Sequence, residues 1–473
     1  MFRTIINKPL YLFTVYLIIH LLIRLFFPDS IQVDDREQIF YAQQLHFGYL
    51  MPQPPLYSWL SWLFFQFLGP NIISLSVLKY SLILLTFIYI TKISNYLFRD
   101  KELIVFSSYS FLLMPSFFWH MHQGFTHTIL LGVGIVITIF YLLELNTHIN
   151  LKSYFGLGVG LSIGFLSKYS FLIFFLIILL TIFFSKDYRS ILFNKKIFIS
   201  ALVLFLATFP HYLWLSDNFH DIFLQANERL KVEKSIEFNI KHVILTLESF
   251  LGFISPLVLF LVPIFIKNFK NLIKQPEPNL VLFRNFYIVV LISLILFFIF
   301  FDIPHIKVRW LHPLMMIFPF WFFLEFKKKS FYSETFKKIF IGIVLILSLT
   351  VILVRLIQNT IGPELGFYGR LNIPITKTLE KIPKNNLESR VITTTNYDIF
   401  AHAVSIFQDN QITFNEKIFN KSIKNSLSVG CIKIEDTPFT HNDFYDFKRI
   451  ETYVAERKYE IFYAKSDMKS CSN

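Results

Sequence analysis

Residues 30–60, "SIQVDDREQIFYAQQLHFGYLMPQPPLYSWL", follow the apolar run "PLYLFTVYLIIHLLIRLFF" at 9–27. A run of about 18 apolar residues is long enough to cross a bilayer as a helix. The chain therefore leaves a membrane and at once presents Asp34, Asp35 and Glu37. It then returns through a Pro-Pro pair and several aromatic residues. This stretch predicts an acidic loop, held at the membrane surface, between two membrane helices.

The composition extends this membrane assignment to most of the chain. Of 473 residues, 54% are hydrophobic and 16% are charged, whereas soluble domains carry about 25% charged residues. We therefore expect an all-α polytopic membrane protein with about eleven spans. They are predicted at 9–27, 75–97, 103–119, 125–145, 154–168, 169–185, 197–215, 244–266, 285–302, 311–326 and 338–356. The 154–185 stretch fits either two short helices or one kinked helix.

The positive charge of the chain indicates its orientation rather than a nucleic-acid partner. The formal net charge is +13, but the Lys and Arg residues gather in short loops, as the positive-inside rule describes. No basic stripe with stacking aromatics stands out, so we expect no nucleic-acid binding. The clusters that define the cytoplasmic side are Arg3–Lys8, Arg99–Lys101, Lys186–Lys196, Lys267–Arg284 and Lys327–Lys338. The N-terminus is then cytoplasmic.

The composition changes after about residue 357. The stretch "SRVITTTNYDIFAHAVSIFQDNQITF", 389–414, predicts strand, helix, strand, and "RIETYVAERKYEIFYAKS", 449–466, predicts further strands. We expect a membrane domain at 1–356, with its first outer loop at 28–74, and a small extracytoplasmic α/β domain at 357–473. Both cysteines, Cys431 and Cys471, lie in the second domain. They either form a disulfide or remain two unrelated thiols.

The acids of the outer loop have two compatible explanations. "DDREQIFYAQQL" has the pattern of a helix start, where the macrodipole favours negative charge. A helix beginning at the membrane surface would also hold a carboxylate in a fixed position for chemistry.

Four stretches, in order, resemble one family. They are "D-D-x-E-Q…GY…QPPLYSWL" in the outer loop, "GFLSKYSFLIF" at 164–174, "PHYLWL" at 210–215 and "VRWLHPLMMIFPF" at 308–320. Together they resemble the protein O-mannosyltransferase-like enzymes (glycosyltransferase family 39, including aminoarabinose-transferase-like proteins). These are membrane-embedded class C glycosyltransferases that use lipid-linked donors. The resemblance covers most of 1–356 and implies the class C fold.

The resemblance implies that Asp34, the first acid of the pair, is the catalytic carboxylate. An acceptor hydroxyl attacks a sugar poorly unless a positioned base removes its proton. A polyprenyl-phosphate sugar supplies an activated anomeric carbon and a phosphate leaving group. Asp35 and Glu37 could orient Asp34, contact acceptor hydroxyls or hold a divalent cation. The sequence requires no metal or other cofactor.

A departing phosphate needs cations, and two candidates lie beside apolar runs. Lys168 is deep in apolar sequence, where an ionisable residue indicates function, although it could also be a lysine that snorkels from a helix end. Arg309 precedes an apolar span and could instead be an interfacial anchor. We expect both to bind the donor phosphate. The weaker candidates for substrate contact are Tyr169, His127, His211 and His312.

Two other motifs contain residues typical of binding sites but match no strong metal-binding or nucleotide-binding pattern. "WHMHQGFTH" at 119–127 contains His120, His122 and His127, but its spacing matches no strong zinc motif. The resemblance implies an acid in this loop, and here "QGF" has none. The glycines of "GLGVGLSIG" at 156–164 lack the Walker lysine pattern and favour close helix packing.

We therefore expect a transferase that moves one sugar from a polyprenyl-phosphate donor to lipid A, another envelope glycan, a lipid or a protein outside the cytoplasm. Residue usage and motif style fit a bacterial inner membrane with undecaprenyl phosphate as carrier. The alternative is a transporter or flippase for a lipid-linked glycan. A transporter would keep its ionisable residues near mid-membrane, whereas these residues are predicted to lie on one face.

Overall fold

A computed structural model describes residues 8–230, 240–268, 276–300, 308–327, 332–388, 390–414, 417–418, 430–439 and 447–466. The chain divides into two compact units, each built from several separate segments. Unit 1 comprises Met1–Leu17, Phe47–Tyr57 and Ser81–Val351. Unit 2 comprises Ile18–His46, Ser58–Tyr80 and Ile352–Asn473.

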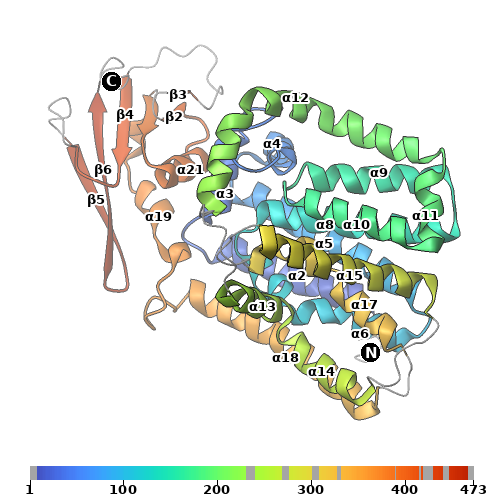
Figure 1. The fold of residues 1–473 in the computed structure, drawn as a ribbon. Coiled ribbons are helices and arrows are strands. Elements are labelled where there is room, and N and C mark those ends of the chain that lie inside the picture. The colour runs from blue at the N-terminus through green and yellow to red at the C-terminus, as the bar shows by residue number, and fades with distance from the viewer. Residues whose placement is uncertain are drawn as a thin grey trace. The chain divides into compact units, whose positions relative to one another are not determined.

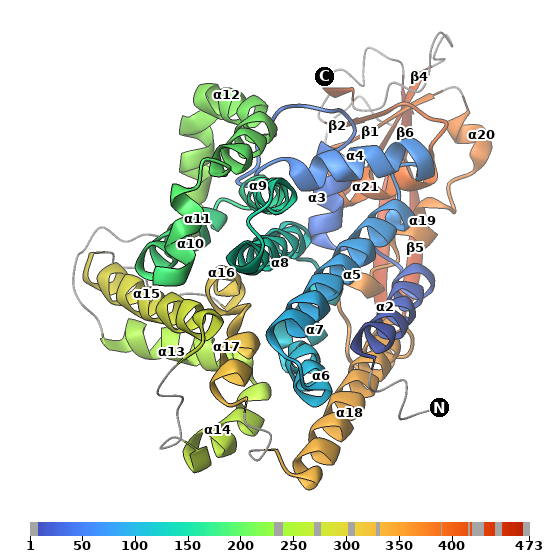
Figure 2. The ribbon, with the colours of Figure 1, turned by 90° about the vertical axis from the view of Figure 1, so that its right-hand side faces the viewer.

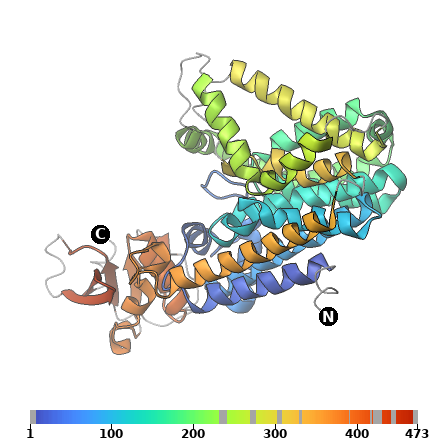
Figure 3. The same cartoon turned by 90° about the horizontal axis from the view of Figure 1, so that it is seen from below.

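Three long helices contribute residues to both units: α2 (Pro9–Phe26), α5 (Ile72–Leu97) and α18 (Glu334–Asn359). Helix α18 is continuous over 26 residues and is drawn in orange in Figure 3. These helices follow the apolar runs of the sequence, because a backbone in lipid must satisfy its hydrogen bonds internally.

The rest of unit 1 is also helical (Figures 1 and 2). Its helices are α6 (Lys101–Tyr109), η1 (Ser110–Leu113), α7 (Pro115–Phe118), η2 (His120–His122), α8 (Thr126–Thr147), α9 (Leu151–Phe165), α10 (Phe171–Phe184), α11 (Lys186–Phe193), α12 (Ile197–Leu230), α13 (Ile240–Ile254), α14 (Leu257–Asn268), α15 (Pro278–Phe300), η4 (Val308–Trp310), α16 (His312–Met315) and α17 (Phe318–Glu325).

The described residues contain six helices long and apolar enough to cross a membrane. Three bent pairs raise this to as many as nine if each pair is one span. Two predicted spans correspond to shorter elements: 154–168 is the 15-residue α9, and 311–326 contains α16 and α17, of 4 and 8 residues. The 154–185 stretch is two helices. The protein is therefore a largely helical integral membrane protein, and the total of eleven spans stays a prediction.

Glycines bring α8 and α9 into close contact. A Cβ atom on Gly160 would lie 2.7 Å from the backbone nitrogen of Thr138, and one on Gly134 would lie 2.6 Å from that of Gly164. No larger residue fits at such distances without a shift of the backbone. The packing interpretation of the 156–164 glycines is confirmed.

Unit 2 carries a mixed sheet of six strands in the order β3-β2-β1-β4-β6-β5. Strand β1 pairs parallel with β2 and β4, and the remaining pairs are antiparallel. The predicted strand–helix–strand at 389–414 is confirmed as β1, α21 and β2, and 449–466 falls in the β5–β6 hairpin. The strands are β1 (Arg390–Thr394), β2 (Ile412–Phe414), β3 (Lys417–Ile418), β4 (Gly430–Glu435), β5 (Phe447–Val454) and β6 (Arg457–Ser466).

Short helices complete unit 2: α3 (Val33–Tyr41), α4 (Leu56–Leu68), η6 (Arg370–Asn372), α19 (Ile375–Leu379), α20 (Lys384–Leu387) and α21 (Tyr397–Ile406). The core joins the outer loop to the C-terminal segment. Ile31 and Ile39 are buried in the same apolar cluster as Ile399 and Phe400, and α3 packs on α21. Cys431 is buried in β4, whereas Cys471 lies outside the described residues. The boundary at 356 stays a prediction.

Candidate active site

The acidic stretch forms the helix α3, as its helix-start pattern predicts. Asp34 and Asp35 lie in its first turn, where the exposed backbone N–H groups favour negative charge. Asp34 and Glu37 are half-buried, and Asp35 is fully buried. The two adjacent acids therefore occupy different surroundings.

Asp35 forms a buried ion pair with Arg24 of α2. The Arg24 Nε atom also donates a hydrogen bond to Ser76 Oγ at 2.9 Å. Among the described residues, the second carboxylate oxygen of Asp35 is buried without a hydrogen-bond partner. Because Asp35 is enclosed and matched to its own cation, it is suited to fix the position of α3 rather than to meet substrate.

Two further buried cations belong to the same neighbourhood. Lys79 of α5 is fully buried, and Arg355 of α18 is almost so. The charges of Arg24, Arg355, Asp35 and Asp34 all act on Lys79. Sequence reasoning missed Arg24, Lys79 and Arg355, although a charged residue inside an apolar span was the signal available for each.

In unit 1, motifs that carry the family resemblance contact one another although they are far apart in sequence. The Nδ1 atom of His211 donates to the carbonyl oxygen of Phe47 at 3.0 Å. A Cβ atom on Gly48 would lie 2.0 Å from the ring of Trp214, so only glycine fits there. The N–H of Leu56 donates to Leu166 O at 3.1 Å. The Gly-Tyr and Pro-Pro-Leu parts of the loop thus contact the 210–215 and 164–174 motifs.

Lys168 lies at the break between α9 and α10. It is half-buried, and its Nζ atom donates to Thr128 Oγ1 at 3.1 Å. The neighbouring His127 donates from Nδ1 to Ser167 O at 3.2 Å. Tyr169 OH lies 3.4 Å from His211 Nε2. Because His211 Nδ1 donates to a carbonyl, this Nε2 atom is the acceptor in the neutral ring.

His312 lies between Arg309 and the group of residues around Lys168. Its buried ring packs edge-on against Phe253, with centroids 5.1 Å apart. Nδ1 lies 3.3 Å from Arg309 O, and Nε2 has no hydrogen-bond partner among the described residues. The charge of Lys168 acts on the His312 ring. The Arg309 side chain is exposed, and residues 301–307, which precede its motif, lie outside the described part of the chain.

The three histidines of "WHMHQGFTH" have separate partners. His122 Nε2 lies 3.0 Å from Tyr16 OH, His120 stacks on Phe125, and His127 bonds Ser167 as above. No group of three or more His, Cys, Asp or Glu residues able to hold a metal occurs within the described ranges. The arrangement gives the zinc interpretation no support.

Comparisons with known proteins agree with these motifs. The family model described as dolichyl-phosphate-mannose-protein mannosyltransferase matches residues 52–214. The crystal structure of ArnT from Cupriavidus metallidurans bound to undecaprenyl phosphate superposes with a TM-score of 0.60, at 10% identity, over 95% of this chain and 97% of that one. The apo structure of the same protein gives a TM-score of 0.54 at 11% identity. This chain therefore has the ArnT fold.

The resemblance to the protein O-mannosyltransferase-like class is confirmed, and the chain is a glycosyltransferase. Its relatives include two lipopolysaccharide core galacturonosyltransferases of Rhizobium johnstonii. RgtB is 26% identical over 377 residues, which are 79% of this chain and 76% of RgtB. RgtA is 22% identical over 401 residues, 84% of this chain and 79% of RgtA. Enzymatic relatives favour the transferase over the transporter alternative.

Proposed function

We propose that this glycosyltransferase moves one sugar from a polyprenyl-phosphate donor to an acceptor outside the cytoplasm, with Asp34 as the general base. The observation that carries the proposal is the contrast between adjacent acids in α3. Asp35 is enclosed by its ion pair with Arg24, whereas Asp34 is half-buried at the same helix start. Of this pair, Asp34 is the carboxylate that an acceptor can approach.

In the proposed step, Asp34 takes the proton of an acceptor hydroxyl as its oxygen forms a bond to the anomeric carbon. The bond from that carbon to the phosphate oxygen breaks, and the lipid phosphate keeps the electron pair. The class C resemblance implies inversion at the anomeric carbon. Glu37 is half-buried one turn from Asp34, and we assign it contact with acceptor hydroxyls. This step needs no metal or other cofactor.

The phosphate is assigned to the group around Lys168. Lys168 supplies a point charge, and Arg309, with an exposed guanidinium, can grip a phosphate through two hydrogen bonds. The buried Nε2 of His312 and the Tyr169–His211 pair offer further polar contacts. Negative charge on the phosphate grows as the sugar leaves, so fixed cations stabilise the transition state. ArnT bound to undecaprenyl phosphate supports a lipid phosphate as carrier.

The relatives also suggest the sugar and the acceptor. RgtB and RgtA are lipopolysaccharide core galacturonosyltransferases. We therefore assign lipopolysaccharide, in its core or lipid A, as the acceptor class and a uronic acid as the first sugar to test. The enzyme would lie in a bacterial inner membrane, with its N-terminus cytoplasmic and residues 357–473 outside.

The decisive experiment compares envelope glycolipids from cells with and without this chain by mass spectrometry. Loss of one sugar mass from lipopolysaccharide is the expected result. Purified enzyme should then restore that mass to lipopolysaccharide from the deletion cells when given undecaprenyl-phosphate-linked galacturonic acid. If the two profiles are identical and purified protein transfers no sugar from a panel of undecaprenyl-phosphate sugars, the proposed function is wrong.

The orientation is tested separately, by labelling single engineered cysteines in a variant without Cys431 and Cys471. An impermeant maleimide should label a cysteine at exposed Arg457 in spheroplasts, and a cysteine at Lys195 only after lysis. The opposite pattern would overturn the orientation and place the acids on the wrong side.

A further inference from the structure

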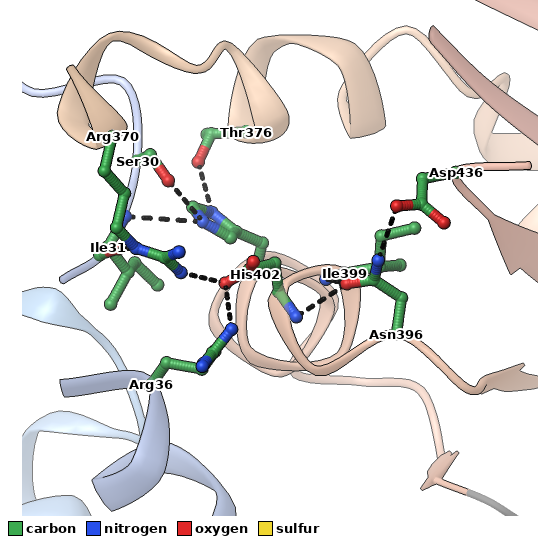
Figure 4. Close-up of polar contacts among 10 residues, drawn as sticks. Ser30, Ile31, Arg36, Arg370, Thr376, Asn396, Ile399, His402 and Asp436 are labelled. Atoms are coloured by element: carbon green, nitrogen blue, oxygen red, sulfur yellow. Dashed lines mark hydrogen bonds and ion pairs between the residues drawn. The ribbon is translucent and has the colours of Figure 1, made fainter. Parts of the chain in front are cut away.

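The helix α3 is held by residues that follow it by more than three hundred positions. Asp398 of α21 accepts from Arg36 Nη1 at 3.1 Å and also pairs with Arg370. Figure 4 labels both arginines, and dashed lines mark their contacts with this carboxylate. Arg370 Nε in turn donates to the carbonyl oxygen of Ile31 at 3.0 Å. One carboxylate therefore links a residue inside α3 to the backbone just before it.

His402, also on α21, contacts the same backbone. Its Nε2 atom accepts from the N–H of Ile31 at 3.4 Å and lies 3.2 Å from Ser30 Oγ (Figure 4). Its Nδ1 atom lies 2.9 Å from Thr376 Oγ1. An amide N–H can only donate, so Nε2 must be the acceptor and Nδ1 carries the proton. The neutral ring thereby fixes the approach to α3.

A third contact lies one residue earlier. The backbone N–H of Asp29 donates to Leu371 O at 2.9 Å, and its carboxylate pairs with Lys377 at 2.7 Å. The segment from Asp29 to Arg36 is therefore bound along its length by residues of η6, α19 and α21.

A second side of α3 is fixed by Asp35 through Arg24. Successive residues of an α-helix point about 100° apart. Asp35 and Arg36 are thus anchored in two directions, and Asp34 precedes them in the same turn. A helix held on two sides cannot rotate or slide without breaking one set of contacts, so the position of Asp34 is set by both.

We propose that Asp398 and His402 are positioning residues of the transferase, which hold α3 so that Asp34 reaches the acceptor hydroxyl. This inference rests on the proposed function. The C-terminal segment is then part of the catalytic apparatus and acts through Asp34 without touching substrate. A displacement of about 1 Å can cost roughly 100-fold in rate, so we expect loss of these contacts to lower turnover per folded molecule. Asp398 and Arg36 are 24% and 22% exposed, so solvent partly screens their pairing.

The test compares Asp398→Asn with Asp398→Glu, Arg36→Gln and His402→Gln. Arg449→Gln is the matched control, because Arg449 forms exposed ion pairs with Glu451 and Glu460 on the β5–β6 hairpin. We expect kcat of Asp398→Asn to fall about 10-fold or more, with donor KM within about twofold. Asp398→Glu should recover part of the loss, and Arg449→Gln should match wild type.

A double variant separates positioning from a general structural role. If Asp398 acts through Asp34, then Asp34→Asn combined with Asp398→Asn should be no slower than Asp34→Asn alone, per folded molecule. Multiplying losses, or an Asp398→Asn enzyme as fast as the Arg449→Gln control, would overturn the inference. If Asp34→Asn itself turns over normally, the proposed general base is wrong. If Asp34→Asn is inactive and Asp398→Asn is normal, only the positioning role is lost.

Discussion

The first turn of α3 and the segment around Lys168 are both polar regions of an apolar chain, but they are built differently. Around α3, charged side chains form ion pairs: Asp35 pairs with buried Arg24, and Arg36 pairs with Asp398. Around Lys168, the contacts include a threonine hydroxyl, a backbone carbonyl and stacked rings. Ion pairs hold the shape of the first region, whereas the role proposed for the second is to bind a phosphate that arrives with the donor and leaves with the lipid carrier.

The sharpest way to break this comparison is to neutralise the two adjacent acids separately. Asp34→Asn should lower turnover by about 10²–10⁴-fold, as loss of a general base typically does, with near-normal yield. Asp35→Asn should instead lower the yield of folded protein, because it removes the carboxylate that pairs with the buried charge of Arg24, at a cost of roughly 3–5 kcal/mol. Turnover per folded molecule and size-exclusion yield distinguish the two. Near-normal turnover by Asp34→Asn would remove it from the mechanism.

The Lys168 region is tested by its two cations. Lys168→Ala and Arg309→Ala should both weaken donor use severely, because the leaving phosphate loses stabilising charge. Arg309→Lys should restore only part of it, since an ammonium group lacks the bidentate geometry. Donor-dependent turnover and binding of undecaprenyl phosphate are measured per folded molecule. Unchanged values in both alanine variants would mean that these residues are interfacial anchors, and would leave the case for Asp34 intact.

A smaller effect is expected from the pH dependence of stability. Burial lowers the pKa of His402 from 6.5 to about 3, with the nearby charges of Asp398 and Arg370 acting in opposite directions. Between these values the unfolded state binds a proton that the folded state does not, so stability falls as pH falls, by up to about 1.4 kcal/mol per unit.

Thermal midpoints of the detergent-solubilised enzyme, measured from pH 7 to 4.5, should therefore fall less steeply in His402→Gln than in wild type. The Arg449→Gln variant should keep the wild-type slope. Equal slopes in all three proteins would show that His402 is not linked to folding in this range.

The smallest effect concerns divalent cations. Turnover should be unchanged, within about twofold, after dialysis against EDTA, because the proposed proton transfer and phosphate departure use protein groups alone. Loss of activity that returns with Mg²⁺, Mn²⁺ or Ca²⁺ would give the acids of α3 a metal-binding role instead.

Local patterns predicted a good part of this molecule. The start of α3, the break at Lys168 and the strands at 390–414 follow from residue order, because each depends on neighbours in sequence. Asp398 and His402 were not predictable as partners of the outer loop. They lie 362 residues from Arg36 and 372 from Ser30, and no periodicity reports a contact over such a separation. The sequence shows Arg24 and Lys79 as charged residues within predicted spans, but it does not indicate which residues they contact.

The joining of α3 to α21 also has a consequence for biogenesis. His402 is made 372 residues after Ser30, which at about 5–20 residues per second corresponds to roughly 20–75 s of translation. A nine-residue helix such as α3 is marginal by itself in water. During that interval the residues of α3 have been synthesised, but α21, which holds α3 in the folded protein, has not. Assembly of the catalytic loop is thus coupled to late synthesis, and a chain whose synthesis ends before residue 398 has an unsupported α3.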